Sequence, residues 1–467
     1  MDTKKLRQKI LDLAIRGKLV PQDPNDEPAS VLLERIRAEK EQLIKEGKIK
    51  RTKKSASSDT SHYENVPFEV PNNWCWINIM EILLKLTDGT HHSPKNYPKG
   101  NYKYITAKNI KNEGIVCEDV TYVDDLTHHE IFGRCNPEYG DILYIKDGAT
   151  TGIVAINNLT EEFSLLSSVA LLKPSKLISN KYLFYYLQSS YCYESVRSSM
   201  KGVGITRITL KQISNWNIPI PPIEEQYRIV EYIDSLFSHI NLIEKDRTYL
   251  KDFLEKYRHA ILNLAIVGKL VTQNPTDEPA IELLKRITPG YKPTHNRHYR
   301  QLPDSWEMCQ LKDIFDITMG QSPAGNTING KCGIEFHQGK LSFTEKYLSE
   351  SGQYTTAPSK VAVPESLLLC VRAPVGIVNI TKREICIGRG LCSLRPKYDI
   401  DCLYWLYMLS TLKDYFEENA TGSTFKAISG DIIRNATIPF PPLLEQKRIL
   451  SKINELLNFI DKITAEL

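Results

Sequence analysis

The sequence predicts a mixed α/β (α+β) protein in which two similar globular domains are joined by two long helical connectors. Three observations lead to this prediction. Two segments of the chain occur twice, the stretches between the copies resemble each other weakly, and the copies carry apolar residues at helical spacing. Together they indicate an internal duplication in which globular and helical parts alternate.

The two repeated segments lie at different offsets. LAIRGKLVPQDPNDEPA begins at Leu13 and returns as LAIVGKLVTQNPTDEPA at Leu264, an offset of 251 residues. IPIPPIEEQYRIV begins at Ile218 and returns as IPFPPLLEQKRIL at Ile438, an offset of 220 residues. Because the offsets differ by 31 residues, the stretch between the two repeated segments is 31 residues longer in the first half of the chain than in the second.

The stretches between the repeats contain weaker echoes of one another. VPNNWCWINI at Val70 resembles LPDSWEMCQL at Leu302, and GDILYIKDGATTGIVAI at Gly140 resembles ESLLLCVRAPVGIVNI at Glu365. We therefore divide the chain into an N-terminal helical region (1–56), a first globular domain (57–217), a central helical spacer (218–290), a second globular domain (291–437) and a C-terminal helix (438–467).

The central spacer reads as one long helix. Apolar residues follow Gln226 at alternating spacings of three and four, which is the 3.5-residue period of a coiled coil. At ~1.5 Å per residue, the stretch from Gln226 to Val267 makes a rod about 60 Å long. Gly268 is predicted to end this helix, and a second helix is predicted to start near Asp277-Glu278-Pro279 and to run to Ile287. The predicted seam consists of Ile229, Ile233, Leu236, Ile240, Ile243, Leu250, Leu254, Tyr257, Ile261 and Leu264.

The two chain ends together repeat this helical pattern. The offsets place Leu467 opposite position 247 and Met1 opposite position 252. The missing equivalents would span only ~6 Å of helix. We expect the termini to meet and the split rod to pack antiparallel against the intact one, which gives a pseudo-twofold, cyclic arrangement. The alternative is a heptad run that serves only to oligomerise the chain.

Composition indicates an ordinary globular protein without obvious targeting signals. The chain has 467 residues, of which 41% are hydrophobic and 25% charged, and its net charge of +4 permits local basic faces. The ten cysteines form no CxxC pair, so reduced single thiols are expected and no metal site. The charged N-terminus and the lack of an 18-residue apolar run favour a cytoplasmic protein that makes no contact with a membrane.

Motifs for catalysis are missing from the sequence. An adenine methyltransferase needs Asn or Asp before its Pro-Pro pair, but here Ile220 and Phe440 precede the two pairs. There is no Walker A loop for ATP and no nuclease pattern, and GVG at Gly202 is too short for a dinucleotide site. The chain is therefore expected to bind or recognise rather than to catalyse.

The repeated segments resemble the conserved regions of the specificity subunit of type I restriction-modification systems. YITAKNIKNEGIV at Tyr104, GDILYIKDGATTG at Gly140 and GVGITRIT at Gly202 resemble its target-recognition domains. The second domain fits more loosely, with GIEFHQGKLSF at Gly333 and VRAPVG at Val371. The resemblance covers essentially the whole chain.

This resemblance implies a non-catalytic subunit that recognises double-stranded DNA. Each domain would read one half of a bipartite, asymmetric target, and the spacer would fix the unread gap. Two modification subunits would bind the helices and methylate adenine with S-adenosylmethionine, and restriction subunits would add ATP- and Mg²⁺-dependent cleavage. The chain itself would hold no cofactor, in a bacterial or archaeal cytoplasm near the nucleoid. The alternatives are a coiled-coil scaffold protein and a standalone DNA-binding regulator.

DNA contact requires cations for phosphates and forked side chains for base edges. For each candidate residue the competing interpretation is an ordinary solvated charge, and for the spacer glutamines it is local capping of the helix entry. Arg134 and Lys360 are further basic candidates. The predicted DNA-binding residues are Lys103, Lys108, Asn109, Lys146, Lys201, Thr206 and Arg207 in the first domain and His337, Gln338, Lys340, Arg372, Arg389, Thr424 and Lys426 in the second; the predicted partner-binding residues are Gln226, Tyr227, Gln446 and Lys447. Trp74 and Trp306 are predicted to be core residues.

Overall fold

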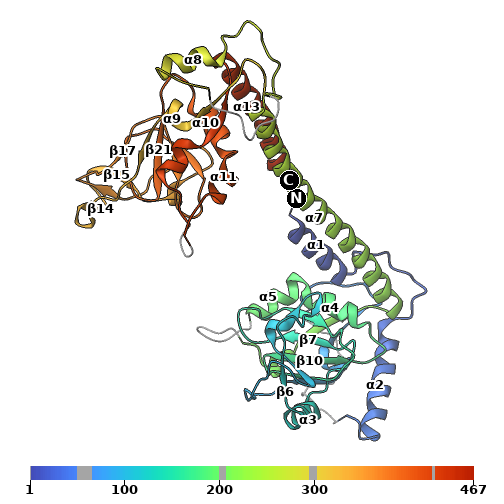
Figure 1. Cartoon of the computed structure of the whole chain (residues 1–467). Coiled ribbons are helices and arrows are strands. Elements are labelled where there is room, and N and C mark those ends of the chain that lie inside the picture. Colours follow the sequence, from blue (N-terminus) through green and yellow to red (C-terminus); the bar gives the residue numbers. More distant parts are fainter. Residues whose placement is uncertain (1, 50–65, 199–206, 294–301, 423–425) are drawn as a thin grey trace. The chain divides into compact units, whose positions relative to one another are not determined.

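The computed structural model describes residues 2–49, 66–198, 207–293, 302–422 and 426–467. They fall into two units, Met1–Lys245 and Asp246–Leu467, and each unit combines one globular domain with helices (Figure 1). In this described part of the chain, no helix is both long and apolar enough to cross a bilayer. The predictions for Lys201, Thr206 and Thr424 lie outside the described residues.

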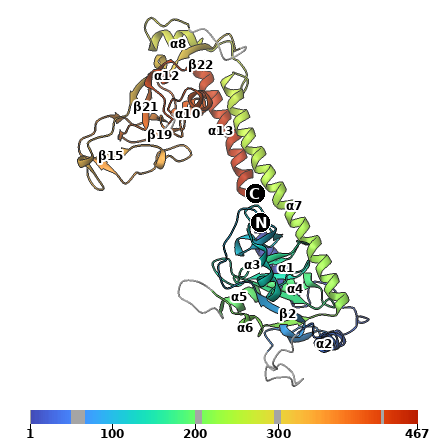
Figure 2. The same cartoon turned by 60° about the horizontal axis from the view of Figure 1, so that its bottom comes forward.

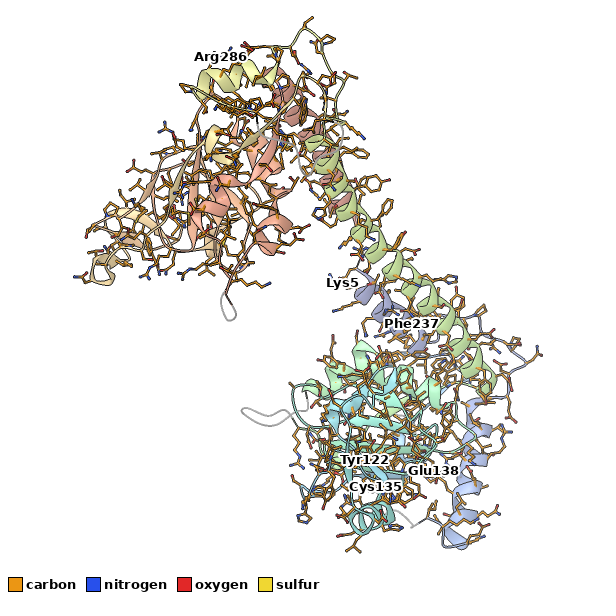
Figure 3. The ribbon with its side chains drawn as sticks, viewed as in Figure 1. Lys5, Tyr122, Cys135, Glu138, Phe237 and Arg286 are labelled. Carbon is orange, nitrogen blue, oxygen red and sulfur yellow. The ribbon has the colours of Figure 1, made fainter. Side chains whose placement is uncertain are left out.

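In the first unit, α1 (Thr3–Ile15) packs beside the first part of the 44-residue helix α7 (Ile223–Ile266). The Arg7 guanidinium donates to Glu244 Oε2 at 3.0 Å and lies 5.0 Å from the centre of the Phe237 ring. Figure 3 labels Phe237 on α7. The contact therefore combines an ion pair with a cation–π interaction.

A buried joint ties the start of α7 to the first domain and to the chain after α1. Trp74 Nε1 donates to Glu225 Oε2 at 2.8 Å, and Gln22 Nε2 donates to Glu225 Oε1 at 2.5 Å. Trp74 is only 5% exposed, which confirms its predicted core position. Since Arg7 lies near Glu244 and Gln22 near Glu225, α1 and α7 run antiparallel.

The second unit builds the same joint on α13 (Leu443–Glu466). Trp306 Nε1 donates to Glu445 Oε2 at 2.9 Å, and Gln273 Nε2 donates to Glu445 Oε1 at 2.5 Å. Trp306 is 6% exposed, again as predicted. The second part of α7 lies beside α13 in both views (Figures 1 and 2), and Arg258 on α7 pairs with Asp461 on α13.

Both predicted helix ends of the spacer are confirmed. α7 stops at Ile266, and Gly268 follows in the left-handed region with φ of 71°. A Cβ at Gly268 would lie 2.6 Å from Pro303 Cγ, so only glycine fits this turn. The next helix, α8, runs from Ala280 to Ile287, as the sequence indicated.

The predicted coiled-coil seam is only partly correct. Ile233 is 0% and Ile240 is 3% exposed, whereas Ile243, Tyr257 and Leu264 are 41%, 51% and 44% exposed. In the second unit Leu254 and Ile261 are each 8% exposed and belong to the core, so Tyr257 and Leu264, which alternate with them, lie outside the buried face. The strict heptad pattern therefore overstates how much of the helix is buried.

The first domain contains a four-stranded antiparallel sheet of order β2-β10-β7-β8 and a three-stranded sheet β6-β3-β9, and the pair β1-β11 closes it at the spacer. A Gly-containing pair, β4-β5, lies beside them. Its elements are β1 (Cys75–Asn78), η1 (Ile79–Glu81), β2 (Leu83–Asp88), β3 (Tyr102–Ile105), η2 (Ala107–Asn109), β4 (Ile110–Lys111), β5 (Gly114–Ile115), β6 (Thr121–Val123), α3 (Asp125–Arg134), β7 (Ile142–Ile145), β8 (Val154–Ile156), β9 (Phe163–Leu165), β10 (Val169–Pro174), α4 (Asn180–Gln188), α5 (Ser190–Ser198), α6 (Leu210–Ile213) and β11 (Asn217–Ile220), and α2 (Ala29–Lys45) precedes them.

The second domain repeats this plan with the sheet β13-β21-β18-β19 and the closing pair β12-β22. Its second sheet is larger, with five strands in the order β14-β16-β15-β20-β17. Its elements are β12 (Glu307–Gln310), α9 (Leu311–Ile314), β13 (Phe315–Met319), η3 (Gly325–Thr327), β14 (Ile328–Asn329), β15 (Ile334–His337), η4 (Lys340–Ser342), β16 (Tyr354–Thr355), β17 (Val361–Ala362), β18 (Ser366–Cys370), β19 (Val378–Thr381), β20 (Ile385–Ile387), β21 (Leu391–Pro396), α10 (Cys402–Ser410), α11 (Lys413–Glu418), α12 (Gly430–Asn435) and β22 (Thr437–Phe440).

Strand register makes the two sheets comparable residue by residue. In the first domain Ala170 pairs with Asp88, and in the second Cys392 pairs with Met319 at the same place in the sheet. Lys146 directly follows β7 in the first domain, and Val371 directly follows β18 in the second. Ile208 N donates to the Lys146 carbonyl at 2.9 Å, and Ile428 N donates to the Val371 carbonyl at 3.0 Å. Asp88 and Lys146 of the first domain therefore correspond to Met319 and Val371 of the second.

Candidate nucleic-acid interface

Three of the predicted DNA-binding residues in the first domain keep some access to solvent. Lys108 is exposed on the short helix η2, and the Arg207 side chain is 56% exposed. Lys103 is partly buried because its ammonium group pairs with Glu161 Oε1 at 2.7 Å. Lys108 and Arg207 thus offer cationic groups to a polyanion, whereas the charge of Lys103 is already paired.

The structure contradicts the predicted DNA contact of Asn109. Its side chain is 3% exposed, and its Oδ1 accepts a hydrogen bond from Thr106 N at 3.1 Å. Its Nδ2 donates to the Val116 carbonyl at 3.2 Å. Asn109 therefore shapes the turn that presents Lys108, because asparagine readily caps short helical turns.

The structure also contradicts the predicted phosphate contact of Lys146. This residue is 1% exposed, and its Nζ lies 2.9 Å from Asp147 Oδ2 and 3.5 Å from Asp88 Oδ2. Asp88 in turn pairs with Arg134, and Asp147 pairs with Arg207. The ammonium group of Lys146 is thus enclosed between two carboxylates and cannot reach DNA.

In the second domain, backbone hydrogen bonds hold two loops together. Gly388 N donates to the His337 carbonyl at 2.8 Å, and Gly390 N donates to the Gln338 carbonyl at 3.1 Å. A Cβ at Gly390 would lie 2.3 Å from that carbonyl oxygen, so the close approach requires glycine. We call this arrangement the strapped turn; it leaves Gln338 and Arg389 exposed.

Further exposed cations belong to the same domain. Arg372 and Lys426 are exposed on neighbouring segments, because Ala373 N donates to the Lys426 carbonyl at 3.0 Å. Burial raises the pKa of the Cys370 thiol, while the Arg372 backbone and the charge of the exposed Lys340 lower it in part. Lys340 begins the short helix η4, two residues after Gln338.

His337 is a predicted DNA contact that the structure contradicts. It is 2% exposed, and its Nε2 lies 2.9 Å from Glu335 Oε1. Burial lowers the pKa of His337. Burial also opposes ionisation of Glu335, but hydrogen bonds from Arg383 and from Ser351 N bring the pKa of its carboxyl down to about 2. The histidine belongs to a buried polar cluster below the strapped turn.

Two of the four predicted partner contacts are likewise buried. Gln226 and Gln446 are both 0% exposed. Gln226 Oε1 accepts from Ser179 N at 3.0 Å, and Gln446 Oε1 accepts from Tyr398 Oη at 2.6 Å. Each glutamine therefore fastens a spacer helix to its own domain and is not available to a partner, which corrects the prediction.

The other two predicted partner contacts remain accessible. Tyr227 is 52% exposed, and Lys447 is exposed at the corresponding position of α13. The sequence analysis missed a row of aromatic residues on α7 in the second unit. Tyr249, Phe253 and Tyr257 are 70%, 41% and 51% exposed. Their spacing of four residues was the available signal, but the heptad interpretation placed Tyr257 in the buried seam.

Leu341 is a second residue that the sequence analysis missed. Its relative exposure is 101%, and it follows the exposed Lys340 on the short helix η4 beside the strapped turn. An apolar side chain among cations is suited to contact a thymine methyl group. Hydrophobic periodicity cannot find such a residue, because an isolated leucine in a loop has no pattern.

Comparison with protein families decides what this arrangement belongs to. Residues 71–251 and 303–467 each match the sequence model described as the type I restriction modification DNA specificity domain. The two matched segments cover most of the chain and most of each globular domain. The chain belongs to this family.

Individual specificity subunits agree with the assignment over nearly their full length. The chain is 29% identical over 84% of its length to the putative type I restriction enzyme MjaX specificity subunit of Methanocaldococcus jannaschii, and covers 89% of it. It is 27% identical over 99% of its length to the EcoEI specificity subunit of Escherichia coli, and covers 90% of it. A solved chain from a type I R-M system shares the fold, with a TM-score of 0.62 at 24% identity over 86% of this chain and 94% of that one.

Membership fixes the general function of this specificity subunit. It is the DNA sequence-recognition component of a type I restriction-modification system, and it is not an enzyme by itself. Within the residues that the structure describes, no group of three or more His, Cys, Asp or Glu side chains is placed to hold a metal ion. The alternatives of a scaffold protein and a standalone regulator are not supported by the family.

Proposed function

We propose that each globular domain of this specificity subunit reads one half of a bipartite, asymmetric sequence in double-stranded DNA. The proposed domain limits are 57–217 and 291–437. The proposal rests on one observation. In their four-stranded sheets the two domains share the same strand order and register, but they expose different side chains on their loops. Arg389 is exposed in the strapped turn of the second domain. By strand register, the equivalent position of the first domain is occupied by Ser167. Two copies with different tips suit two different half-sites.

The proposed DNA contacts are the exposed residues of these tips. Arginine and glutamine offer bidentate hydrogen bonds to base edges, and lysine offers a charge for phosphates. In the first domain we propose Lys108 and Arg207, and Lys103 as a weaker phosphate contact. In the second domain we propose Gln338, Lys340, Arg372, Arg389 and Lys426.

A methylation map tests the proposal directly. Host cells would carry this chain with its modification subunit, and their genomic DNA would be read by single-molecule sequencing for methylated adenine. A new motif with two specified parts and an unspecified gap is the expected result. A continuous motif, or none, would contradict the assignment of one half-site to each domain. Arg389→Gln should change the motif in one part only.

We further propose that the helices form two coiled-coil-like antiparallel spacers with pseudo-twofold symmetry. Support comes from the same Trp-Glu-Gln joint in both units, with α1 packed against α7 in one and α13 in the other. If the termini meet, cysteines introduced by Asp2→Cys and Glu466→Cys should be joined by a short bifunctional maleimide within one chain. Failure to cross-link at low protein concentration would count against the closed arrangement.

We propose that two modification subunits dock on the spacer helices and bring S-adenosylmethionine, while restriction subunits bring ATP and Mg²⁺ chemistry in the cytoplasm. Exposed Tyr227, Lys447 and the aromatic row at Phe253 support docking, since aromatic side chains are enriched at interfaces. Phe253→Ala should weaken assembly about tenfold or more by analytical ultracentrifugation. Lys251→Ala, an exposed neighbour on the same helix, is the matched control and should leave assembly unchanged.

A further inference from the structure

Five charged side chains form an alternating series through the first domain. Arg134 Nη2 lies 3.0 Å from Asp88 Oδ1, and Lys146 Nζ lies 3.5 Å from Asp88 Oδ2. The same Nζ is 2.9 Å from Asp147 Oδ2, and Asp147 Oδ1 is 3.2 Å from Arg207 Nε. We call this series the charge relay. Its centre is buried and its two ends reach the surface.

Stability does not explain the centre of the relay. Enclosing an ammonium group and a carboxylate carries a large desolvation cost, and an apolar pair of similar volume is often as stable or more so. The second domain shows such a pair on the same frame, because Met319 and Val371 occupy the equivalent positions. A buried Lys146 beside Asp88 is therefore a feature that this fold can do without.

The surface end of the relay is where it affects function. The Arg207 side chain is 56% exposed, and its Nε lies 3.2 Å from Asp147 Oδ1 in an ion pair that lacks hydrogen-bond geometry. Its backbone is also fixed, by an antiparallel bridge with Asp147 and by the hydrogen bond from Ile208 N to the Lys146 carbonyl. Because the guanidinium group approaches Asp147 through Nε, its two terminal nitrogens form the outer, planar fork, the geometry that recognises guanine or a phosphate.

We propose that Lys146 is a positioning residue for DNA recognition by the first domain. Its ammonium group fixes Asp147, which orients the Arg207 fork toward DNA, and Asp88 together with Arg134 anchors the opposite side of the ammonium group. This proposal rests on the proposed reading of one half-site by this domain. It replaces direct phosphate contact by Lys146, which burial excludes.

Four variants of the full chain separate positioning from folding. Arg207→Gln removes the fork itself, and Asp147→Asn breaks the link at a side chain that is 21% exposed, while the buried Lys146 keeps Asp88 as its partner. Lys146→Met removes the centre. The double variant Asp88→Met with Lys146→Val copies the apolar pair of the second domain and should fold. Lys176→Gln removes one exposed charge from the same domain and serves as the control.

Binding is measured with three duplexes: the mapped target, the target with its first half scrambled, and the target with its second half scrambled. Each relay variant is expected to bind the mapped target about 10- to 100-fold more weakly. The penalty for scrambling the first half should shrink equally, and the penalty for scrambling the second half should stay unchanged. Adding Arg207→Gln to Asp147→Asn should cause no further loss, because both act through one group.

The outcomes distinguish this inference from the proposed function. If the unmodified chain shows no penalty for either scrambled half, the proposed function fails. If it shows both penalties and a folded Asp147→Asn variant behaves like the unmodified chain, only the positioning role of the relay fails. Additive losses for Arg207→Gln and Asp147→Asn would also overturn it. Thermal unfolding of every variant identifies those that are folded.

Discussion

The two recognition domains place oppositely charged pairs at the same position with the signs exchanged. In the first domain Lys103 on β3 pairs with Glu161, and in the second Glu335 on β15 pairs with Arg383. The registers are equivalent. Lys103 lies opposite Phe163, which is two residues beyond Glu161. In the second domain Phe336 lies opposite Cys386, and the same register continued by one residue places Glu335 opposite Ile385, two residues beyond Arg383. The two domains thus share an ion pair at this place in the sheet, although the residues that form it differ.

The exchanged pairs differ in environment as well as in sign. Glu161 has a side chain that is 48% exposed, whereas that of Glu335 is 7% exposed and also accepts from Ser351 N at 2.7 Å. The residues that form the ion pair can therefore change while the strands keep the same register. The burial of each pair sets how much it contributes to the stability of its domain. A duplicated domain can diverge in its surface chemistry on such a frame without changing its topology.

The joints at the spacer are the feature that both units share, and we expect the largest effect there. Glu225→Ala leaves the indole N–H of Trp74 and the amide of Gln22 without their acceptor, and Glu445→Ala does the same in the second unit. Each should lower the free energy of unfolding of its own unit by about 2–4 kcal/mol. Hydrogen exchange followed residue by residue measures the effect in each unit.

The matched control for this experiment is Glu224→Ala, because Glu224 is exposed on the same helical turn. It should change protection by less than about 0.5 kcal/mol. If Glu225→Ala destabilised both units equally, or neither, the joints would not be the local fastenings that their hydrogen bonds indicate.

Acid should separate the two domains through the exchanged pairs. Because the pKa of Glu335 falls from 4.5 to about 2 on folding, its stabilisation is complete above pH 4.5 and is lost as pH falls through about 2. The second domain should lose about 3 kcal/mol over that window from this group alone. Glu335→Gln should flatten the dependence, as measured by denaturant titration between pH 5 and 2.

The half-exposed Glu161 should contribute far less, since solvent screens its pair with Lys103. The first domain therefore provides the internal comparison for the acid titration. If Glu161→Gln and Glu335→Gln changed the pH dependence of stability by the same amount, burial would not explain the difference between the two pairs.

Exchanging the charges of the first domain tests whether the frame tolerates either sign. Lys103→Glu and Glu161→Arg should each destabilise the domain by about 0.5–1 kcal/mol, because each places like charges together. The double variant, which copies the arrangement of the second domain, should recover most of the loss. Urea unfolding of the unmodified chain, the two single variants and the double variant gives the coupling energy. If the double variant lost as much stability as the two single variants together, the fold would not accept the exchanged charges.

The smallest expected effect concerns Leu341. Leu341→Ser should leave thermal stability unchanged, because the side chain is fully exposed. It should reduce discrimination at one base pair of the second half-site by several-fold, measured with duplexes that carry uracil in place of each thymine. Discrimination that does not depend on the thymine methyl groups would exclude this contact.

Much of the architecture was predictable because repetition in the sequence carries long-range information. The two pairs of repeated segments identified two domains, the Pro-Pro segments identified helix entries, and Trp74 and Trp306 were correctly assigned to the core. The helix stop at Gly268 followed from local backbone preference. These features depend on neighbours in sequence, or on comparing one half of the chain with the other.

The errors share one physical cause. Lys146, Asn109 and His337 were assigned to the surface because polar side chains are mostly exposed. Each is buried by partners that sequence spacing does not reveal, such as Asp88 for Lys146, 58 positions earlier in the chain. Gln226 illustrates a second limit, because helical periodicity gives the spacing of a face and not the domain that covers it.

The strapped turn has a consequence for how new specificities arise. Main-chain amides and carbonyls hold the loops at His337–Gly388 and Gln338–Gly390, and the first domain has the like bond from Leu166 N to the Ile105 carbonyl at 3.0 Å. Such bonds are indifferent to the side chains they carry. Residues 338 and 389 can therefore be substituted one at a time while every intermediate remains folded. If the strapped turn contacts DNA as proposed, single substitutions at these two positions can change the target while the backbone that carries them stays the same.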